Sequence, residues 1–506
     1  MNEVVAISRA PSGRRRCAKL RLVSEPSIPR ASRATPANGA RVDALTTVDL
    51  VTLSGGRLVR DSHRPILGAA VDSRLVRPGE LFVALPGERT DGHRFLREAV
   101  IAGASAILIA SELDPATMTS FGDVKIVTVA DPLIALQDIA AGWRARFDPL
   151  VVGVTGSIGK TSAKEAIATV LAARAKTLRS EGNQNNEIGL PLTLLRLGKD
   201  DRYGVLEMGM YTGGEIARLA AIAKPTIGVV TSVLGVHLSR IGSIEAVENA
   251  KAELIEALPA NGIAVLNADD PRVRGMAGRT KARAITYGFA RDADIRASNV
   301  RARGAKGMTF QLRISTGESP RALPVRLPML GRLSVHNALA AAAVGVAVGM
   351  EPDQIAAALS RGWSVPHRVQ LLRVGGSTIV DDSYNASPAS MIAALELLSG
   401  LPGRQIAVLG EMLELGDEAE EGHHAVGRAA ARTVAVLITI GPGAAGIADG
   451  ALAAGLDPAV VIQTNDRDAG LAALRHRMQP GDAVLVKASR AAELDRLVDA
   501  LRSEPE

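Results

Sequence analysis

The sequence predicts an α/β protein of about three domains, with a mainly parallel sheet in the middle of the chain. Its 506 residues exceed what one hydrophobic core organises, because domains average roughly 150 residues. Short apolar segments alternate with segments of helical periodicity, which is typical of parallel strands connected by helices. One apolar segment also ends in a glycine-rich turn that opens a helix.

The first 45 residues form a basic tail that we expect to be disordered, because it is rich in Ser, Pro and Arg and lacks periodicity. Residues 1–41 contain nine Lys or Arg and two Glu, whereas the whole chain has a net charge of +6. The remaining residues are therefore close to neutral and give no reason to expect a nucleic-acid partner. We interpret the tail as a flexible extension or an overlong gene start in preference to a transit peptide. It lacks the apolar centre of a secretory signal.

The chain up to residue 364 divides into two further units. Residues 46–148 contain two buried strands, Leu81–Leu85 and Ala106–Ala110. In residues 149–364 strand and helix alternate, which predicts a mainly parallel sheet covered by helices. The predicted strands of that sheet are Val151–Val154, Val205–Glu207, Ile227–Thr231 and Ile263–Asn267. Alternating residues at 291–327 predict a β appendage before an alanine-rich buried helix at 338–348.

The alternation of strands and helices restarts at about residue 365. It predicts a third, doubly wound unit over residues 365–506. The strands of this unit are expected at Thr378–Asp381, Ile406–Leu409, Val436–Ile440 and Ala483–Lys487.

Composition excludes several classes of protein. The lone cysteine, Cys17, excludes an internal disulfide and a cysteine-based zinc site. No apolar stretch reaches the ~18–20 residues that span a bilayer. We therefore expect a soluble, cytoplasmic protein without a membrane partner.

The segment from Val151 to Thr161 is the most informative motif. Glycines let backbone N–H groups turn toward an anion, and a helix N-terminus adds positive potential. Lys160 is expected to neutralise β- and γ-phosphate charge, and the hydroxyl of Thr161 to hold Mg²⁺. The motif predicts a nucleotide site, with a chance glycine turn as the alternative. It joins an apolar strand to a helix predicted over Ser162–Leu171, and its residues are Thr155, Gly156, Ser157, Ile158, Gly159, Lys160 and Thr161.

Three more residues are candidates for the same site. Glu207 ends one predicted strand and His237 follows another, so both are expected at the sheet edge that carries the phosphate loop. Alone, each is more often a surface acid or a structural histidine; near Thr161 they become candidate metal ligands. Lys251 lies on the apolar stripe of a helix that starts near Ser243, where an ammonium is costly unless it is paired or modified. Snorkelling to solvent is the alternative.

Polar groups in the later units have weaker signals. The loop Asn183–Pro191 is dense in amides, which bind backbone turns or the carbonyls and hydroxyls of a ligand. Asp382 follows a strand, where an acid suits ribose hydroxyls. Arg368 lies at the junction of the second and third units, where a mobile domain brings a cation to a transferring phosphate. Lys487 ends the last strand at the same rim. Taken singly, each is more often surface than site.

Together and in this order, these segments resemble the Mur ligase family over residues 46–503. The N-terminal part of the resemblance rests on Asp72-Ser73-Arg74, Pro78–Leu85 and Asp91-Gly92-His93. The resemblance implies an N-terminal α/β UDP-substrate domain, a central P-loop ATPase domain and a C-terminal Rossmann-like ligase domain. The segments Asn183–Pro191 and Asp382–Met391 resemble the member that adds D-alanyl-D-alanine to UDP-N-acetylmuramoyl-tripeptide.

The resemblance also implies which residues form the sites. ATP would contact residues 155–161, with Asn337 at the adenine, Asp382 at the ribose and Arg368 at the phosphates. In the family the lysine is carbamylated and offers a carboxylate to Mg²⁺, whose ligands would be Thr161, Glu207, His237 and Lys251. The catalytic residues would be Lys160, Lys251, His237 and Arg368. The two other substrates would contact Ser73, Arg74, Asn183, Asn185, Asn186, Asn385 and Lys487.

The reaction implied is ATP-driven formation of a peptide bond through an acyl phosphate. Lys160, Arg368 and Mg²⁺ would offset the repulsion between the attacking carboxylate and the γ-phosphate. One alternative is another ligase of the same fold, either tripeptide-forming or folylpolyglutamate-type. The other is a nucleotide-dependent switch or scaffold, which would hydrolyse ATP slowly without an amine acceptor. We expect a monomer.

Overall fold

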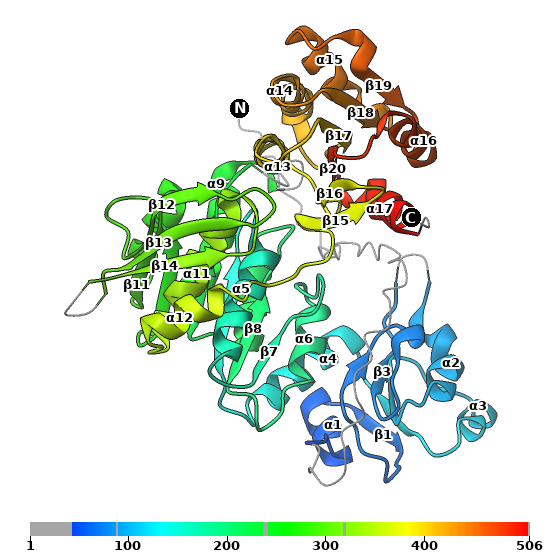
Figure 1. The fold of residues 1–506 in the computed structure, drawn as a ribbon. Helices are drawn as coiled ribbons and strands as arrows, with labels where there is room; N and C mark the ends of the chain where they lie inside the picture. Colours follow the sequence, from blue (N-terminus) through cyan, green and yellow to red (C-terminus); the bar gives the residue numbers. More distant parts are fainter. Residues whose placement is uncertain (1–42, 88–89, 236–240, 317–319, 504–506) are drawn as a thin grey trace, which may run out of the picture. The chain divides into compact units, whose positions relative to one another are not determined.

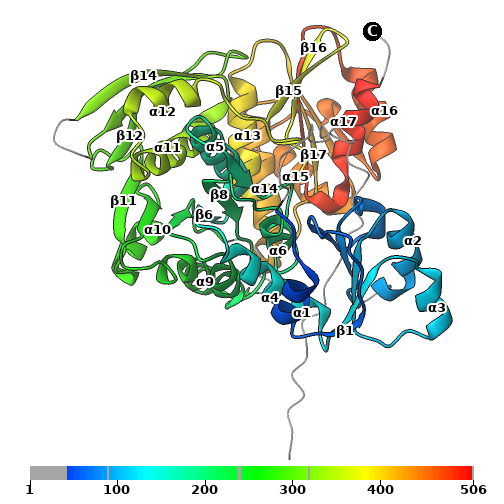
Figure 2. The same ribbon diagram turned by 90° about the horizontal axis from the view of Figure 1, so that it is seen from below.

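The computed structural model describes residues 43–87, 90–235, 241–316 and 320–503. The chain divides into two compact units, with the boundary between Ile139 and Ala140, and each is described by itself. Figures 1 and 2 show the elements from two directions. Within the described ranges, no helix combines the length and the apolar character that a membrane span requires.

The first unit is built on a five-stranded sheet in the order β1-β5-β4-β3-β2, in which only β1 is antiparallel to its neighbour. Its strands are β1 (Arg57–Arg60), β2 (Ala69–Ala70), β3 (Leu81–Val83), β4 (Ala106–Ile109) and β5 (Lys125–Thr128). Its helices are α1 (Thr47–Ser54), α2 (Leu96–Ile101), α3 (Pro115–Ser120) and the first part of α4 (Pro132–Arg144). Phe82, Ile107 and Ile126 are buried together on one face of this sheet.

The second unit begins with a nine-stranded sheet in the order β14-β13-β12-β11-β10-β9-β6-β8-β7. Its strands are β6 (Leu150–Thr155), β7 (Thr177–Arg179), β8 (Tyr203–Glu207), β9 (Ile227–Val230), β10 (Ile263–Asn267), β11 (Arg283–Gly288), β12 (Ile295–Ala302), β13 (Met308–Ile314) and β14 (Arg321–Leu327). The neighbouring strands β12, β11, β10, β9, β6, β8 and β7, given in their order in the sheet, all pair in parallel, as predicted. The strands expected in residues 291–327 form. They are not a separate appendage, because β12 pairs with β11 and extends the same sheet.

Helices cover both faces of this sheet. One face packs on α5 (Lys160–Ala172), α11 (Gly331–Ala347) and α12 (Pro352–Leu359), and Figure 2 shows α5 beside α11. The other face packs on α7 (Glu215–Ala223) and α9 (Ile244–Glu256). A Cβ at Gly153 of β6 would lie 2.7 Å from Cδ1 of Leu254. Glycine at this position therefore lets α9 approach the sheet closely, at the level where Lys251 is carried. The short helices α6 (Gly189–Leu194) and α10 (Pro271–Gly275) follow strands of this sheet.

The last part of the second unit contains a six-stranded sheet in the order β15-β16-β20-β17-β18-β19, parallel except for β15. Its strands are β15 (Gln370–Val374), β16 (Ser377–Asp381), β17 (Gln405–Gly410), β18 (Val436–Ile440), β19 (Val461–Thr464) and β20 (Ala483–Lys487).

Successive residues of β20 face opposite layers of helices. Leu485 packs with α13 (Pro388–Ser399), α14 (Ala419–Ala431) and α15 (Ala445–Ala453). Val484 and Val486 pack with α16 (Arg467–Arg477) and α17 (Leu494–Arg502). The sheet is therefore doubly wound, as predicted. The domain boundaries placed at residues 46, 149 and 365 stay predictions.

Candidate active site

The turn after β6 carries the phosphate-binding motif. Helix α5 begins at Lys160, two residues before the predicted start, and Gly159 precedes it with a φ of 80°. Glycine adopts this left-handed conformation without strain. The first N–H groups of a helix have no intrahelical acceptor, so they are available to an anion. The Nζ of Lys160 folds back over the turn and donates to the carbonyl oxygens of Gly156, at 2.7 Å, and Ser157, at 3.3 Å.

Residues that follow β9 hold the turn in place. The hydroxyl of Thr231 donates to the carbonyl oxygen of Ile158 at 2.6 Å, and the N–H of Ile158 donates to Oγ of Ser232 at 3.1 Å. Gly156 packs against the same segment, because a Cβ there would overlap Oγ1 of Thr231. These contacts occupy the N–H of Ile158. The anion-binding role therefore falls mainly on the start of α5 and on Lys160.

Glu207 lies where the sequence predicts it, at the end of β8 beside the phosphate loop. The residue is 2% exposed. Its Oε1 accepts a hydrogen bond from Nδ2 of Asn185 at 2.9 Å, and its N–H donates to Oγ of Ser180 at 3.1 Å. Within the described part of the chain, Oε2 is buried and has no hydrogen-bond partner. A buried carboxylate oxygen without a partner is costly, so this atom is a good candidate to bind a cation.

Lys251 lies on the buried side of α9 and is 2% exposed. Burial lowers the pKa of Lys251 well below its usual value, and the positive charge of Lys160 lowers it further. Burial also lowers the pKa of Lys160; the carboxylate of Glu207 opposes this effect and the guanidinium of Arg368 adds to it. The prediction that Lys251 faces the core is confirmed, and solvent snorkelling is wrong for this side chain.

Of the four candidate metal ligands, Thr161, Glu207 and Lys251 are described by the structure, whereas His237 lies outside the described residues. Thr161 is in the first turn of α5, next to Lys160. The ranges that the structure describes contain no cluster of three or more His, Cys, Asp or Glu side chains able to hold a metal ion. The fit to a cation therefore rests on the unpartnered Oε2 of Glu207.

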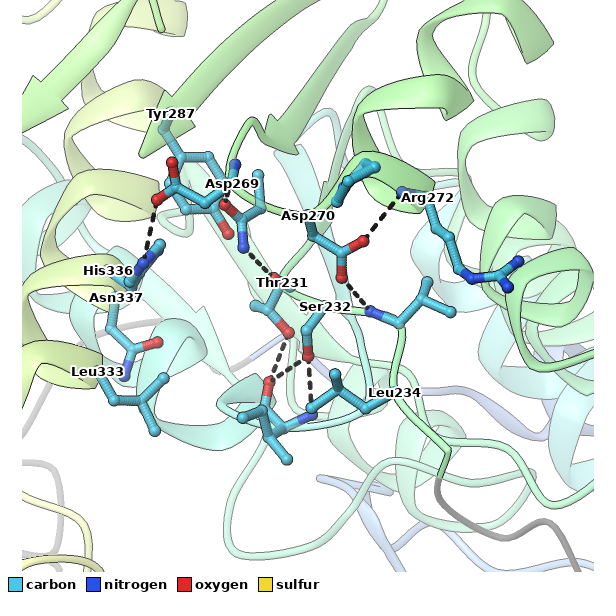
Figure 3. A pocket seen from close by; sticks show the side chains of 14 residues that line it. Thr231, Ser232, Leu234, Asp269, Asp270, Arg272, Tyr287, Leu333, His336 and Asn337 are labelled. Carbon is cyan, nitrogen blue, oxygen red and sulfur yellow. Dashed lines mark hydrogen bonds and ion pairs between the residues drawn. The ribbon is translucent and has the colours of Figure 1, made fainter. Parts of the chain in front are cut away.

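A cavity of about 550 Å³ opens beside the phosphate loop. Figure 3 shows His336 and Asn337 of α11 on one side of it and Asp270 and Arg272 on the other. Ile158 of the phosphate loop also lines the cavity, and Oδ1 of Asn337 lies 3.2 Å from the position of a Cβ at Gly159. The structure thus brings Asn337 next to the phosphate loop, within reach of a ligand that occupies both.

The polar wall of this cavity was not predicted. Asp269 accepts hydrogen bonds from the N–H groups of Phe289 and Ala290, both at 2.7 Å, and pairs with Nε2 of His336 at 3.2 Å. Burial lowers the pKa of His336, against the effect of Asp269. Asp269 lies two residues after the end of β10, so the expectation that found Glu207, a polar group at the carboxyl end of a parallel strand, also applies to it. His336 gave no comparable signal, because it lies within helix α11 and not at the end of a strand.

Amides of the loop after β7 hold protein groups. Asn185 bonds to Glu207, and its carbonyl oxygen accepts from the N–H of Gly209 at 2.8 Å. Oδ1 of Asn186 accepts from the N–H groups of Ile188, at 3.3 Å, and Gly189, at 2.9 Å, at the start of α6. Asn183 lies in the same loop, where its carbonyl oxygen accepts from the N–H of Asn185. These amides shape the site around Glu207; contact with a substrate stays a prediction.

In the six-stranded sheet, Asp382 and Lys487 form a buried ion pair. Nζ of Lys487 lies 2.6 Å from Oδ2 of Asp382 and donates to the carbonyl oxygen of Asn385 at 2.9 Å. The other carboxylate oxygen of Asp382 accepts from the N–H of Val369 at 3.2 Å. The structure therefore brings together Asp382, which the resemblance assigns to ATP, and Asn385 and Lys487, which it assigns to the other substrates.

Arg368 lies at the same rim, with its guanidinium carbon 4.4 Å from the ring centre of Tyr384. Among the described residues no carboxylate pairs with it. Its influence on the pKa of Lys160 places it in the electrostatic neighbourhood of the phosphate loop.

Ser73 and Arg74 belong to the first unit, in a short 3-10 helix that Asp72 caps. Arg74 pairs with Asp72 at 2.6 Å. Ser73 and Arg74 thus belong to a different unit from the phosphate loop, and their contact with a substrate stays a prediction.

Family models of the Mur ligases match three successive parts of the chain. The catalytic domain model matches residues 65–144, the middle domain model residues 154–345, and the glutamate ligase domain model residues 367–490. The chain belongs to the Mur ligase family. The UDP-N-acetylmuramoyl-tripeptide–D-alanyl-D-alanine ligase of Mycobacterium tuberculosis (strain ATCC 25618 / H37Rv) is 38% identical over 500 residues, which is 90% of this chain and 97% of the relative.

Solved Mur ligases have the same architecture. A crystal structure of MurF from Acinetobacter baumannii aligns with a TM-score of 0.80 and 27% identity, covering 92% of this chain and all of that one. MurF from Thermotoga maritima, solved in complex with ADP, aligns with a TM-score of 0.74 and 29% identity over 86% of this chain and 97% of its own. The predicted three-domain α/β fold and the Mur ligase resemblance are confirmed.

Proposed function

We propose that this Mur ligase joins D-alanyl-D-alanine to UDP-N-acetylmuramoyl-tripeptide, with ATP as the energy source, in the synthesis of peptidoglycan. Curated relatives that align with nine tenths of the chain bear the name of this activity. The observation that carries the proposal is the arrangement at one sheet edge. There the phosphate loop borders a cavity of about 550 Å³, and its Lys160 interacts electrostatically with the buried Glu207 and the buried Lys251.

We place the purine of ATP in the cavity and its triphosphate along the phosphate loop. Asn337 and Ile158 both line the cavity, so a base next to Asn337 would direct its phosphates toward the start of α5. Lys160, folded over the turn, would then swing out to the β- and γ-phosphates. Asp382 would meet the ribose hydroxyls, since its carboxylate is already oriented by Val369 and Lys487.

Thr161, Glu207, His237 and a carbamylated Lys251 would hold Mg²⁺. The ion, when bound, would neutralise charge on the transferring phosphate. The unpartnered Oε2 of Glu207 supports this assignment. Carbamylation would replace the ammonium of Lys251, which is costly in its buried place, by a carboxylate with a partner.

The chain's own residues would carry the reaction as charge stabilisers. The carboxylate of the tripeptide attacks the γ-phosphate and ADP leaves, while Lys160 and Arg368 offset the repulsion between the two reacting anions. The resulting acyl phosphate is attacked by the amine of D-alanyl-D-alanine, and phosphate leaves. Because water would hydrolyse the acyl phosphate, the site must close around it.

The remaining substrate contacts are assigned on the same basis. We propose that Ser73 and Arg74 bind the UDP substrate, and that Asn385 and Lys487 contribute at the rim of the third sheet. Asn183, Asn185 and Asn186 would contact substrate on the side of Glu207. We further propose that the enzyme is a cytoplasmic monomer.

Acceptor-dependent release of phosphate tests the proposal. Purified protein is incubated with ATP, Mg²⁺ and UDP-N-acetylmuramoyl-tripeptide, and phosphate is measured with and without D-alanyl-D-alanine. We expect release only with this dipeptide. Stimulation by meso-diaminopimelate, when UDP-N-acetylmuramoyl-dipeptide replaces the tripeptide substrate, would instead identify a tripeptide-forming ligase. Slow release that ignores every amine acceptor would identify a nucleotide-dependent switch.

A further inference from the structure

Lys164 of α5 is a fully buried charged residue that the reaction above does not use. Its side chain is 0% exposed. An ammonium in such a place is costly unless it is both paired and hydrogen-bonded. Lys164 follows Lys160 by four residues in α5, so the two amines lie on neighbouring turns of one helix face. Lys164 is therefore a buried charge one helical turn beyond the phosphate loop, and the reaction proposed above gives it no function.

The ammonium of Lys164 has two partners. Its Nζ donates to the carbonyl oxygen of Ser180 at 2.7 Å and lies 3.0 Å from Oε1 of Glu165. The other oxygen of Glu165 pairs with Arg179 at 2.9 Å. Glu165 thus compensates the charge from the outside, while the inward contact of Lys164 is to the backbone at Ser180.

Ser180 is the point where β7 passes into the amide loop. It is fully buried, and its N–H donates to the carbonyl oxygen of Val205 at 3.1 Å. Its Oγ accepts the N–H of Glu207 at 3.1 Å. One residue therefore receives the ammonium of Lys164 at its carbonyl and the backbone of Glu207 at its hydroxyl.

The same loop also fixes the carboxylate of Glu207. Asn185, five residues after Ser180, donates to Oε1 and leaves Oε2 without a partner among the described residues. Backbone and side chain of Glu207 are thus both held by residues 180–185, and Lys164 anchors the start of that segment to α5. The phosphate loop and Glu207 are carried by different strands, β6 and β8, and Lys164 is a direct link from the phosphate-loop helix to the segment that orients Glu207.

We propose that Lys164 is a positioning residue that sets the carboxylate of Glu207 relative to the phosphate loop. The proposal rests on the proposed function only in taking Glu207 as a ligand of the metal that accompanies the nucleotide. An apolar side chain of similar length would fill this site without the cost of burying an ammonium. It would provide no donor for the carbonyl of Ser180, so the loop that holds Glu207 would lose its anchor on α5.

Metal-dependent binding of ADP is the test, with Mn²⁺ in place of Mg²⁺. The variants are Lys164→Met, which keeps an unbranched side chain but removes the amine, and Ser180→Ala, which removes the acceptor for the N–H of Glu207. Lys176→Met is the matched control, because the side chain of Lys176 is 60% exposed and pairs with Asp201, outside the contacts of Ser180 and Glu207 described above. Calorimetry measures the affinity for ADP in the presence of Mn²⁺ and in the presence of EDTA. The electron paramagnetic resonance spectrum of bound Mn²⁺ reports the coordination of the ion.

We expect both variants to weaken Mn²⁺-dependent ADP binding by roughly three- to tenfold, the worth of one hydrogen bond. Binding in EDTA should be unchanged, the Mn²⁺ spectrum should broaden, and the control should match the parent in all three. Parental Mn²⁺ affinity in both variants would overturn the proposal, as would an equal loss in EDTA, which indicates damage to the phosphate loop itself. If Lys164→Met does not fold, Ser180→Ala decides, because it leaves the buried ion pair intact.

Glu207→Gln separates this inference from the proposed function. If this variant binds Mn²⁺ and ADP like the parent, Glu207 is no metal ligand, and both the metal site and the role of Lys164 fail. If it loses the metal effect while Lys164→Met and Ser180→Ala keep it, the metal site stands and only the positioning role fails. The identity of the amine acceptor does not enter either result.

Discussion

Substitution of Gly156 by alanine should disable the phosphate loop for a steric reason. Gly156 has a φ of 146°, a conformation that residues with a side chain rarely adopt. A Cβ at this position would overlap Oγ1 of Thr231 and lie 3.0 Å from the backbone nitrogen of Ser232. Neither atom moves freely, because Thr231 donates to Ile158 and Ser232 belongs to the segment that holds the turn.

The expected cost combines three effects. The backbone strain of a non-glycine residue here is about 1–3 kcal/mol. Overpacking against Thr231 adds about 1–3 kcal/mol, and loss of the Thr231 hydrogen bond about 1 kcal/mol. The loop would relieve part of this by shifting, which moves the start of α5. We therefore expect the free energy of unfolding to fall by about 2–5 kcal/mol. The affinity for nucleotide should fall by a larger fraction of its parental value, because the shifted start of α5 is the part that binds the phosphates.

Two measurements on Gly156→Ala check this reasoning: the free energy of unfolding in urea and the affinity for ADP. The double variant with Thr231→Ala is the internal control. It removes the overlapping oxygen but keeps the strained φ and the contact with Ser232, so it should recover part of the stability and little of the affinity. A single variant that unfolds at the parental urea concentration and binds ADP normally would refute the steric argument.

Three further outcomes follow from the buried groups. Lys251→Ala should abolish acceptor-dependent phosphate release, because it removes a proposed ligand of the metal; near-full turnover would exclude Lys251 from the metal site. Lys487→Met should cost about 3–5 kcal/mol by leaving Asp382 buried and unpaired, and urea unfolding should show most of this restored when Asp382→Asn is added. The hydrogen bond to Asp381 raises the pKa of His367, so its stabilising effect is complete below the pKa of an unfolded histidine and is lost as pH rises through the raised value. The difference in thermal midpoint between the parent and His367→Asn should therefore be larger in mild acid than in mild alkali, and a difference that is constant with pH would count against the pair.

Much of the fold follows from the periodicity of the sequence. The parallel strands that the sequence predicts lie within one or two residues of those in the structure, because each is an apolar run between glycine or polar turns. The parallel strands β2, β5, β7, β11 and β19 were not predicted; β7, for example, has three residues, of which only Leu178 is buried. The pairing of β12 with β11 was also missed, because strand pairing depends on residues far apart and leaves no local pattern.

Site residues could be predicted from the sequence where a polar residue stands at the carboxyl end of a parallel strand. Glu207 follows that rule, and Lys251 is visible as a charge on an apolar stripe. Lys164 was missed for the opposite reason: a lysine next to a glutamate in a helix is usually solvent-exposed. Only the contact with Ser180, across two elements, reveals its burial.

The antiparallel end of the nine-stranded sheet bears on how the protein avoids self-association. Strand β14 pairs only with β13 among the described strands, so its outer side is an edge on which a strand of another molecule would dock. Pro324, in the middle of β14, has no N–H to offer such a strand, and the exposed Arg321 and Arg326 would bring like charges together. The edge is thereby protected against intermolecular pairing at the margin of the nine-stranded sheet.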